Sequence, residues 1–281
     1  MTTLFLGLIA AVCWGLHDIT IRYLSRSVPL LGALLFTLLA GLAFQAIVLA
    51  FSNSIRLPQG PAFWLSIGAG VTFLIASLGL YFAFQRGPVR LVSPIIGAYP
   101  IASVLFDLLD GAAISVGQIL AVLVIVAGVG VVAMLADKSG EKIPPKGPTV
   151  ALSLLAALGY ASTFKLGQMA AALDGGLQST FLTRITAVAL LTGIVVIRKG
   201  AIHPGRAALV PLMIMGLLDG VALLAVFSAG RLDNPHFASI SSSMFGLFTI
   251  LLAWSLLRER MTAPQWAGCA MAFLAIGYLA S

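Results

Sequence analysis

The sequence predicts an all-α integral membrane protein, with ten transmembrane helices in two inverted five-helix repeats around a central cavity. The first reason is composition: 60% of the 281 residues are hydrophobic, only 9% are charged, and the mean hydropathy is +1.08. Soluble domains carry about 25% charged residues, so this chain lacks the surface that water requires. The second reason is that ten apolar runs reach spanning length. The third is that a polar connection divides these runs into five and five.

The ten runs are counted against the membrane, whose hydrocarbon core of about 30 Å needs roughly 20 helical residues. Several runs begin with proline, whose missing N–H costs nothing in a first helical turn. No small-residue cleavage site follows the first run, so we expect an uncleaved helix there. The predicted helices are Thr3–Ser25, Pro29–Phe51, Pro61–Phe84, Pro88–Leu109, Ser115–Leu135, Pro148–Ala172, Gln178–Ile197, Ala207–Ala229, Pro235–Leu257 and Ala263–Ala280.

The longest polar connection lies between the fifth and sixth runs. We therefore expect a first five-helix repeat over residues 1–137, a connecting loop over residues 138–147 and a second repeat over residues 148–281. Because five is odd, the second repeat must enter the membrane upside down. Inverted repeats are the plan of many secondary transporters, which bind substrate near the midplane between the halves.

A short self-similarity supports this division. In each half, an apolar helix that starts at a proline is followed by an acidic residue, then by a hydroxyl residue three positions before a glutamine. An apolar helix rich in glycine and alanine comes next. The two passages are Ser115-Val-Gly-Gln118 after the helix from Pro88, and Thr262-Ala-Pro-Gln265 after the helix from Pro235.

Glycines inside the apolar runs, such as Gly128, Gly130 and Gly268, are expected to let helices pack closely. Cys13 and Cys269 also lie in apolar runs and are expected to pack as small hydrophobic side chains. Their positions do not indicate a disulfide framework or a metal site.

The loop charges are distributed unequally between the two sides of the membrane. On the side of the N-terminus the loops carry Arg56 and Arg231. Because cytoplasmic loops are enriched in Lys and Arg, we expect both termini to face away from the cytoplasm. The opposite loops and helix ends carry twelve cations: Arg22, Arg26, Arg86, Arg90, Lys138, Lys142, Lys146, Arg198, Lys199, Arg206, Arg258 and Arg260.

The passage Arg258–Gly268, which begins Arg-Glu-Arg-Met-Thr, resembles the late-helix signature of the drug/metabolite transporter superfamily, EamA type. Trp14-Gly15 in the first helix is also similar to that family. Arg258 replaces the family's usual glycine, and the first-half counterpart, Asp110-Gly111, is followed by two extra residues. The resemblance implies a ten-helix basket that exports amino acids, related metabolites or toxic organic cations. Bacterial exporters of aromatic and other amino acids are the nearest in kind, and several of them have cytoplasmic termini.

Polar and ionisable side chains within membrane helices are costly, so we take them as candidates for the substrate site. A zwitterionic amino acid needs a cation for its carboxylate, and acceptors or aromatic faces for its ammonium. Lys165 and Arg184 are expected to serve the carboxylate. Trp14 and Asp18, on one face of the first helix, are expected to serve the ammonium. The full candidate set is Trp14, His17, Asp18, Tyr81, Tyr99, Tyr160, Lys165, Arg184, Asp219, Ser239, Ser242 and Ser243.

Some of these residues have structural alternatives. Asp219 is a charge partner for Arg184 or Lys165, and such a buried pair would be structural. Separately, the serines between residues 239 and 243 have the alternative of bonding carbonyls of their own helix rather than substrate.

Residues near the helix ends and prolines within the fourth run carry further expectations. Arg22, Arg90 and Arg198 lie near helix ends and are expected to extend to the membrane surface. Pro94 and Pro100 are expected to kink the fourth helix and to free backbone carbonyls that line the cavity.

Two functions of the same fold remain open. The leading hypothesis is a multi-pass secondary transporter of the inner (plasma) membrane that exports amino acids, aromatic ones included, by alternating access. The alternative is a proton-coupled exporter of drugs or organic cations, in which the cation displaces a proton from Asp18 or Asp219. The sequence contains no H-E-x-x-H, G-x-S-x-G or P-loop motif and no metal-spaced Cys/His cluster. We therefore expect no enzyme, cofactor, metal or nucleic-acid partner; the oligomeric state stays open, and a monomer is compatible.

Overall fold

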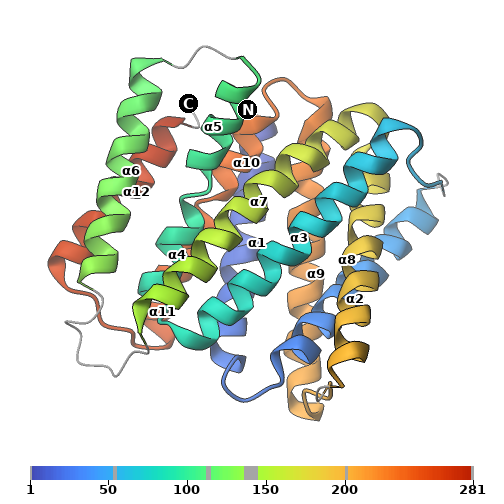
Figure 1. The fold of residues 1–281 in the computed structure, drawn as a ribbon, viewed down its shortest axis with the longest axis horizontal. Helices are drawn as coiled ribbons and strands as arrows, with labels where there is room; N and C mark the ends of the chain where they lie inside the picture. The colour runs from blue at the N-terminus through green and yellow to red at the C-terminus, as the bar shows by residue number, and fades with distance from the viewer. Residues whose placement is uncertain (1, 53–55, 112–114, 136–144, 200–201, 280–281) are drawn as a thin grey trace.

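The computed structural model describes residues 2–52, 56–111, 115–135, 145–199 and 202–279, and the elements in these ranges are helical (Figure 1). Residues 138–144 of the expected connecting loop lie outside the described residues. The helices are α1 Thr2–Leu24, α2 Leu30–Phe51, α3 Pro61–Arg86, α4 Val89–Gly97, α5 Pro100–Leu109, α6 Val116–Met134, α7 Lys146–Asp174, α8 Gly176–Arg198, α9 Arg206–Ser228, η2 Ala229–Arg231, α10 His236–Ser242, α11 Phe245–Leu256 and α12 Ala263–Leu279.

The predicted fold class is confirmed. Nine spans among the described residues are long and apolar enough to cross a membrane, if α4–α5 and α10–α11 each count as one span. The 17-residue α12 provides the tenth apolar helix. The start of α1 and the end of α12 lie on the same side of the bundle, as an even number of crossings requires (Figure 1).

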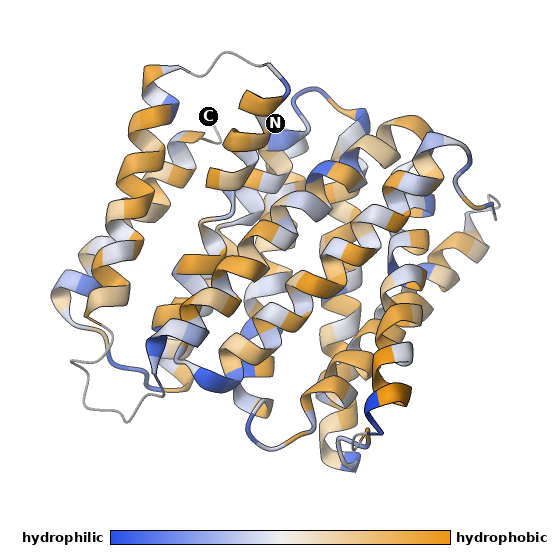
Figure 2. Cartoon of the chain, viewed as in Figure 1, coloured by the Kyte–Doolittle hydropathy of each residue, from blue (hydrophilic) through white to orange (hydrophobic). Residues whose placement is uncertain are grey.

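The surface of the bundle is apolar, unlike that of a soluble protein, and several polar side chains are buried. Large apolar side chains such as Phe5, Trp64 and Leu274 point outward and are 64%, 71% and 76% exposed. Figure 2 shows that hydrophobic residues run along the helices and that hydrophilic residues gather mainly at the helix ends. Polar side chains such as Arg184 and Gln45 are instead fully buried between helices. Lipid is the solvent that fits this arrangement, because it rewards apolar exposure and penalises exposed polar groups.

Helix packing follows the predicted repeat. Each span of the first half has its counterpart in the second: α1 with α7, α2 with α8, α3 with α9, α4–α5 with α10–α11, and α6 with α12. The contacts obey this correspondence, because α3 packs on α7 as α9 packs on α1, and α3 packs on α8 as α9 packs on α2. The pairs α2–α8 and α6–α12 pack against their own counterparts.

Both helices of the α6–α12 pair begin with a glutamine side chain that caps the first turn. Ser115 and Gln118 form a reciprocal capping box at the start of α6. At the start of α12, Gln265 Oε1 accepts a hydrogen bond from the Thr262 backbone N–H at 2.9 Å. The self-similar passages therefore share a physical task, which is to satisfy orphan amides of a first helical turn.

Glycines bring α6 and α12 into close contact. A Cβ on Gly268 would lie 2.7 Å from the Gly128 carbonyl oxygen, which leaves no space for a larger residue. The packing role is thereby confirmed for Gly128 and Gly268. The prediction is wrong for Gly130, where a Cβ would meet nothing within 4 Å.

The fourth span is broken rather than kinked. α4 continues through Pro94 and ends at Gly97, and α5 begins at Pro100. The sequence predicts a kink at Pro94, but α4 continues through this residue and the span breaks only after Gly97. At Pro100 the missing N–H and the fixed backbone angle favour a fresh helical start.

The ninth span is broken at the matching place, which the sequence analysis did not predict. α10 ends at Ser242, and α11 begins at Phe245. No proline lies at this break. The side chains of Ser239, Ser241, Ser242 and Ser243 each bond a carbonyl three or four residues earlier, and such bonds bend a helix.

Candidate functional site

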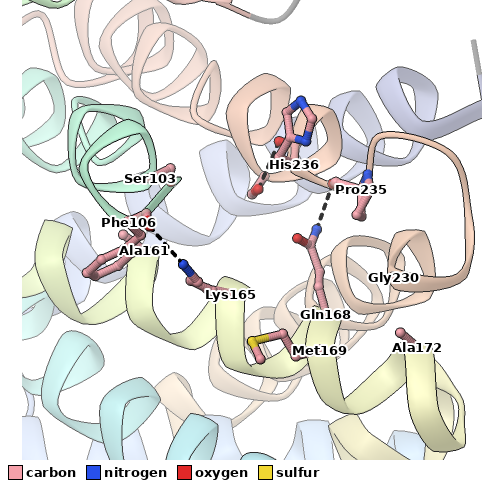
Figure 3. Close-up of a pocket in the computed structure, with 11 residues that line it drawn as sticks. Ser103, Phe106, Ala161, Lys165, Gln168, Met169, Ala172, Gly230, Pro235 and His236 are labelled. Carbon is pink, nitrogen blue, oxygen red and sulfur yellow. Dashed lines mark hydrogen bonds between the residues drawn. The ribbon is translucent and has the colours of Figure 1, made fainter. Parts of the chain in front are cut away.

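A cavity of about 260 Å³, here called the vestibule, lies between α5, α7 and α10 in the half of the bundle nearer the termini (Figure 3). It is lined by Phe106, Lys165, Gln168, His236 and Ser239 among others. Both repeats contribute, since Phe106 belongs to the first half and the other four belong to the second.

Lys165 brings an ammonium group to the vestibule. Its ammonium donates to the Asp110 carboxylate at 2.5 Å and to the Phe106 carbonyl at 3.1 Å, and lies 5.3 Å from the centre of the Phe106 ring. The Asp110 side chain is 64% exposed, so water weakens this pair. A ligand carboxylate could therefore replace Asp110 at low cost.

Gln168 closes the vestibule wall on the side of α9. Its amide nitrogen donates to the Val226 carbonyl at 3.1 Å and to the Pro235 carbonyl at 2.8 Å, as Figure 3 shows for Pro235. One side chain thus ties α7 to the end of α9 and to the start of α10.

A second and deeper cavity, here called the inner chamber, is lined mainly by aromatic side chains. Its lining is Trp14, Asp18, Leu80, Tyr99, Tyr160, Phe164 and Phe245. The Trp14 ring stacks on Phe164 with centroids 5.3 Å apart. The free volume is about 10 Å³, which is roughly the space of a single water. The chamber must therefore widen before it can admit a metabolite.

Tyr99 separates the vestibule from the inner chamber. Its hydroxyl donates to the Ser239 carbonyl oxygen and lies 2.5 Å from the Ser242 hydroxyl oxygen. Ser239 lines the vestibule, while the Tyr99 ring lines the inner chamber. Tyr99 belongs to the break between α4 and α5, and Ser242 to the break between α10 and α11. The two broken helices therefore meet at the wall between the cavities.

A buried charge pair holds one of the residues that line the inner chamber. Asp219 accepts a hydrogen bond from the Trp14 indole N–H at 2.9 Å and another from the Arg184 guanidinium. Arg184 is fully buried, and its charge lies 5.0 Å from the centre of the Phe73 ring. Arg184 thus holds Asp219, and Asp219 holds the Trp14 ring that lines the chamber.

Asp18 brings a carboxylate to the inner chamber. One oxygen lies 2.9 Å from His17 Nδ1, and His17 Nε2 lies 3.3 Å from the Tyr81 hydroxyl. The other carboxylate oxygen, Oδ2, is buried without a hydrogen-bond partner among the described residues. An unpartnered buried oxygen of this kind is costly unless a proton, water or cation occupies it at some stage.

The opposite side of the bundle is closed by a polar lock around Glu259. The Glu259 carboxylate accepts from Arg22 Nε at 3.2 Å and from the backbone N–H groups of Val89 and Arg90 at 3.3 Å. Arg22 also donates to the Phe84 carbonyl at 2.8 Å. Glu259 therefore joins α1 to the start of α4, where a carboxylate suits the helix dipole.

The lock has a neutral counterpart at the vestibule. Arg22 on α1 bonds a carbonyl at the end of α3, and Gln168 on α7 bonds a carbonyl at the end of α9. These elements correspond under the repeat. One side of the bundle is therefore joined through a buried ion pair and the other through a neutral amide.

Comparison with known proteins gives a family. The EamA-like transporter family matches the chain twice, over residues 1–134 and 147–281. This chain belongs to the EamA-like transporter family. A solved structure described as "Crystal structure of protein" shares its fold, with a TM-score of 0.74 and 15% identity, over 99% of this chain and 96% of that one. Comparison with curated proteins gives no match.

The EamA match makes this chain a multi-pass membrane transporter. At 15% identity the solved structure supports the fold and nothing about substrate. Among the described residues, no group of three or more His, Cys, Asp or Glu side chains could hold a metal ion.

The EamA fold distributes the predicted site residues over three places. Lys165 and Ser239 line the vestibule, and Trp14, Asp18, Tyr99 and Tyr160 line the inner chamber. His17, Tyr81, Arg184, Asp219 and Ser242 lie next to these residues, whereas the Ser243 hydroxyl bonds the Ile240 carbonyl of its own span. Of the two cations predicted as partners for Asp219, Arg184 pairs with it, whereas Lys165 pairs with Asp110.

Three expectations are wrong for physical reasons. Lys165 and Arg184 do not share a carboxylate site, because Lys165 bonds Asp110 at the vestibule and Asp219 accepts from Arg184 in the interior. Arg22 and Arg90 do not extend to the membrane surface; they are 9% and 1% exposed. Glu259, folded in from the loop after α11, holds Arg22 in the interior. Arg198 is exposed, as predicted.

The sequence analysis missed Gln168, Phe164 and Phe245 as cavity residues. Gln168 could have been found by aligning α7 with α1 on Tyr160 and Trp14, which places it opposite Arg22. Phe164 and Phe245 carry no such signal, because they are aromatic residues among many in an apolar chain.

Proposed function

We propose that this chain exports amino acids, or related metabolites that carry a carboxylate, by alternating access between its two repeats. The observation that carries the proposal is Lys165, which lines the vestibule with His236 and pairs with Asp110, a carboxylate that is 64% exposed and can be replaced by a substrate carboxylate. A cation in a partly desolvated site attracts carboxylates and disfavours cationic substrates.

The inner chamber supports the second half of the proposal. Its aromatic faces and the Asp18 carboxylate are the groups that bind an ammonium or an aromatic side chain. In our proposal the polar lock around Glu259 opens first, and the ammonium and side chain of the substrate enter the inner chamber. The lock then closes, Tyr99 moves, and the substrate carboxylate rests on Lys165 before it is released through the vestibule.

We also propose the orientation that the loop charges favour. In the plasma membrane, the cation-rich side, which holds Arg26, Arg206 and Arg258, would face the cytoplasm. The vestibule would then belong to an outward-facing state, from which an exporter releases its substrate.

Export of organic cations is the second candidate, and the unpartnered Oδ2 atom of Asp18 favours it. A proton on Asp18 that is displaced by a cation would couple transport to the proton gradient. His17, 2.9 Å away, is the nearest group able to receive that proton.

Counterflow in proteoliposomes tests the amino-acid proposal. We would measure exchange of labelled amino acids, aromatic ones included, by wild type, Lys165→Ala and the exposed control Lys199→Ala. A lost charge-assisted hydrogen bond is worth about 1.5–3 kcal/mol, so Lys165→Ala should lower apparent affinity roughly 10- to 100-fold. The control should exchange normally.

Two outcomes decide against this reading. If folded wild type exchanges no amino acid but expels cationic dyes in a pH-dependent way, the cation proposal replaces it. If Lys165→Ala exchanges as wild type does, Lys165 does not hold the carboxylate.

A further inference from the structure

A large apolar groove opens on the cation-rich side of the bundle, away from the vestibule. It has a volume of about 700 Å³ and is bounded by α1, α9 and the end of α11. Ile19, Leu24, Ala207, Pro211 and Leu256 are among its lining residues. Its size falls in the range of small-molecule sites, about 300–1,000 Å³. The groove shares no lining residue with the vestibule or the inner chamber.

Three exposed arginines flank the lining of this groove. Arg26 lies between Leu24 and Ser27, Arg206 precedes Ala207, and Arg258 follows Leu257. None of the three has an ion-pair partner among the described residues. Arg26 follows α1, Arg206 is the first residue of α9 and Arg258 follows α11, so each adjoins the groove lining through a different segment of the chain.

We propose that the groove binds one anionic glycerophospholipid, with an acyl chain against α1, α9 and α11 and its phosphate on Arg26, Arg206 and Arg258. The combination of an apolar trough and a cationic mouth matches both parts of this ligand. Arginine binds phosphate through paired N–H groups, and basic pockets between membrane helices favour anionic headgroups over zwitterionic ones. Tyr23 lines the groove and is 73% exposed, as aromatic residues at the membrane interface are.

The site lies where the two repeats meet. α1 belongs to the first repeat, whereas α9 and α11 belong to the second, and both pack on α1. A lipid in this groove would contact both bodies that move in alternating access. This consequence rests on the proposed transport function, but the binding itself does not.

Native mass spectrometry of the purified full-length chain in non-ionic detergent tests the binding directly. Phosphatidylglycerol and phosphatidylcholine with identical acyl chains are titrated against wild type and Arg→Gln variants. Phosphatidylglycerol should bind wild type more tightly. Each of Arg26→Gln, Arg206→Gln and Arg258→Gln should weaken it roughly fivefold, and the triple variant roughly 100-fold, without affecting phosphatidylcholine.

Two control variants separate headgroup recognition from acyl-chain recognition. Arg198→Gln removes an exposed arginine of the same side at the end of α8, and should leave phosphatidylglycerol binding unchanged. Ala207→Phe fills the groove and should weaken both lipids. Size-exclusion profiles identify any variant that fails to fold. If Ala207→Phe fails to fold, the three single Arg→Gln variants and the triple variant decide the question.

Several results would overturn the proposal. Equal binding of the two lipids by wild type would remove the headgroup site. A triple variant that keeps its preference for phosphatidylglycerol would place the lipid elsewhere. Competition by glycerol phosphate as strong as that by phosphatidylglycerol would indicate a free-anion site. A lipid-free dimer lost on Ala207→Phe would show that a second copy covers the groove.

Discussion

The buried pair of Arg184 and Asp219 gives the sharpest test of what holds this interior together. The Arg184 side chain is fully buried, and the Asp219 side chain is 7% exposed. Two further guanidinium atoms, Nε and Nη2, have no hydrogen-bond partner among the described residues. Asp219 therefore supplies the countercharge for Arg184, and its replacement leaves a bare cation in a medium without water.

The loss of stability expected on replacing Asp219 follows from this burial. Asp219→Asn keeps the shape and an acceptor for Trp14, but removes the charge. Breaking a buried pair from one side costs about 3–5 kcal/mol of stability. At about 2–4 °C per kcal/mol for a chain near this size, the midpoint of thermal unfolding should fall by roughly 6–20 °C. Replacing both partners, as in Arg184→Met with Asp219→Leu, should restore or exceed the wild-type midpoint.

Thermal unfolding in one detergent at one scan rate provides the assay, with Arg198→Gln as the exposed control. The reasoning fails if Asp219→Asn shifts the midpoint by less than about 2 °C, because Arg184 would then have another countercharge. It also fails if the double variant is less stable than both single variants, since the pair would then contribute more than mutual neutralisation.

Two further predictions concern helix packing and the polar lock. Gly128→Val should lower the free energy of unfolding by about 1–3 kcal/mol, measured by thermal unfolding, because its side chain meets α12 at Gly268. The control Gly130→Val, two positions along, should lower it by less than about 0.5 kcal/mol. Equal losses of stability in the two variants would contradict the packing. Glu259→Ala removes the acceptor for Arg22 and for the first amides of α4, so hydrogen exchange over residues 89–92 should accelerate at least about tenfold. Unchanged exchange there, with the start of α6 as the internal reference, would show that α4 is held by other contacts.

Much of the architecture was predictable because the insertion of a segment into the membrane depends on the hydropathy of that segment alone. An apolar run of about 20 residues must become a helix in lipid whatever surrounds it, so span count and the side of each loop follow from hydropathy. The inverted arrangement follows from the odd number of helices per half. That Asp219 pairs with Arg184 or Lys165 was also predictable, because a membrane interior leaves few countercharges, but only the tertiary structure decides that Arg184 is the partner.

Contacts between distant segments were decided only by the tertiary structure. The sequence places Arg22, Arg90 and Arg198 alike near helix ends, yet the loop that carries Glu259 draws Arg22 inward and leaves Arg198 exposed. Gly128 and Gly130 have similar neighbours in sequence, but only Gly128 faces α12. Helix phase and loop path set these differences. Both depend on which helix surfaces pack together, and the hydropathy of the chain does not determine that.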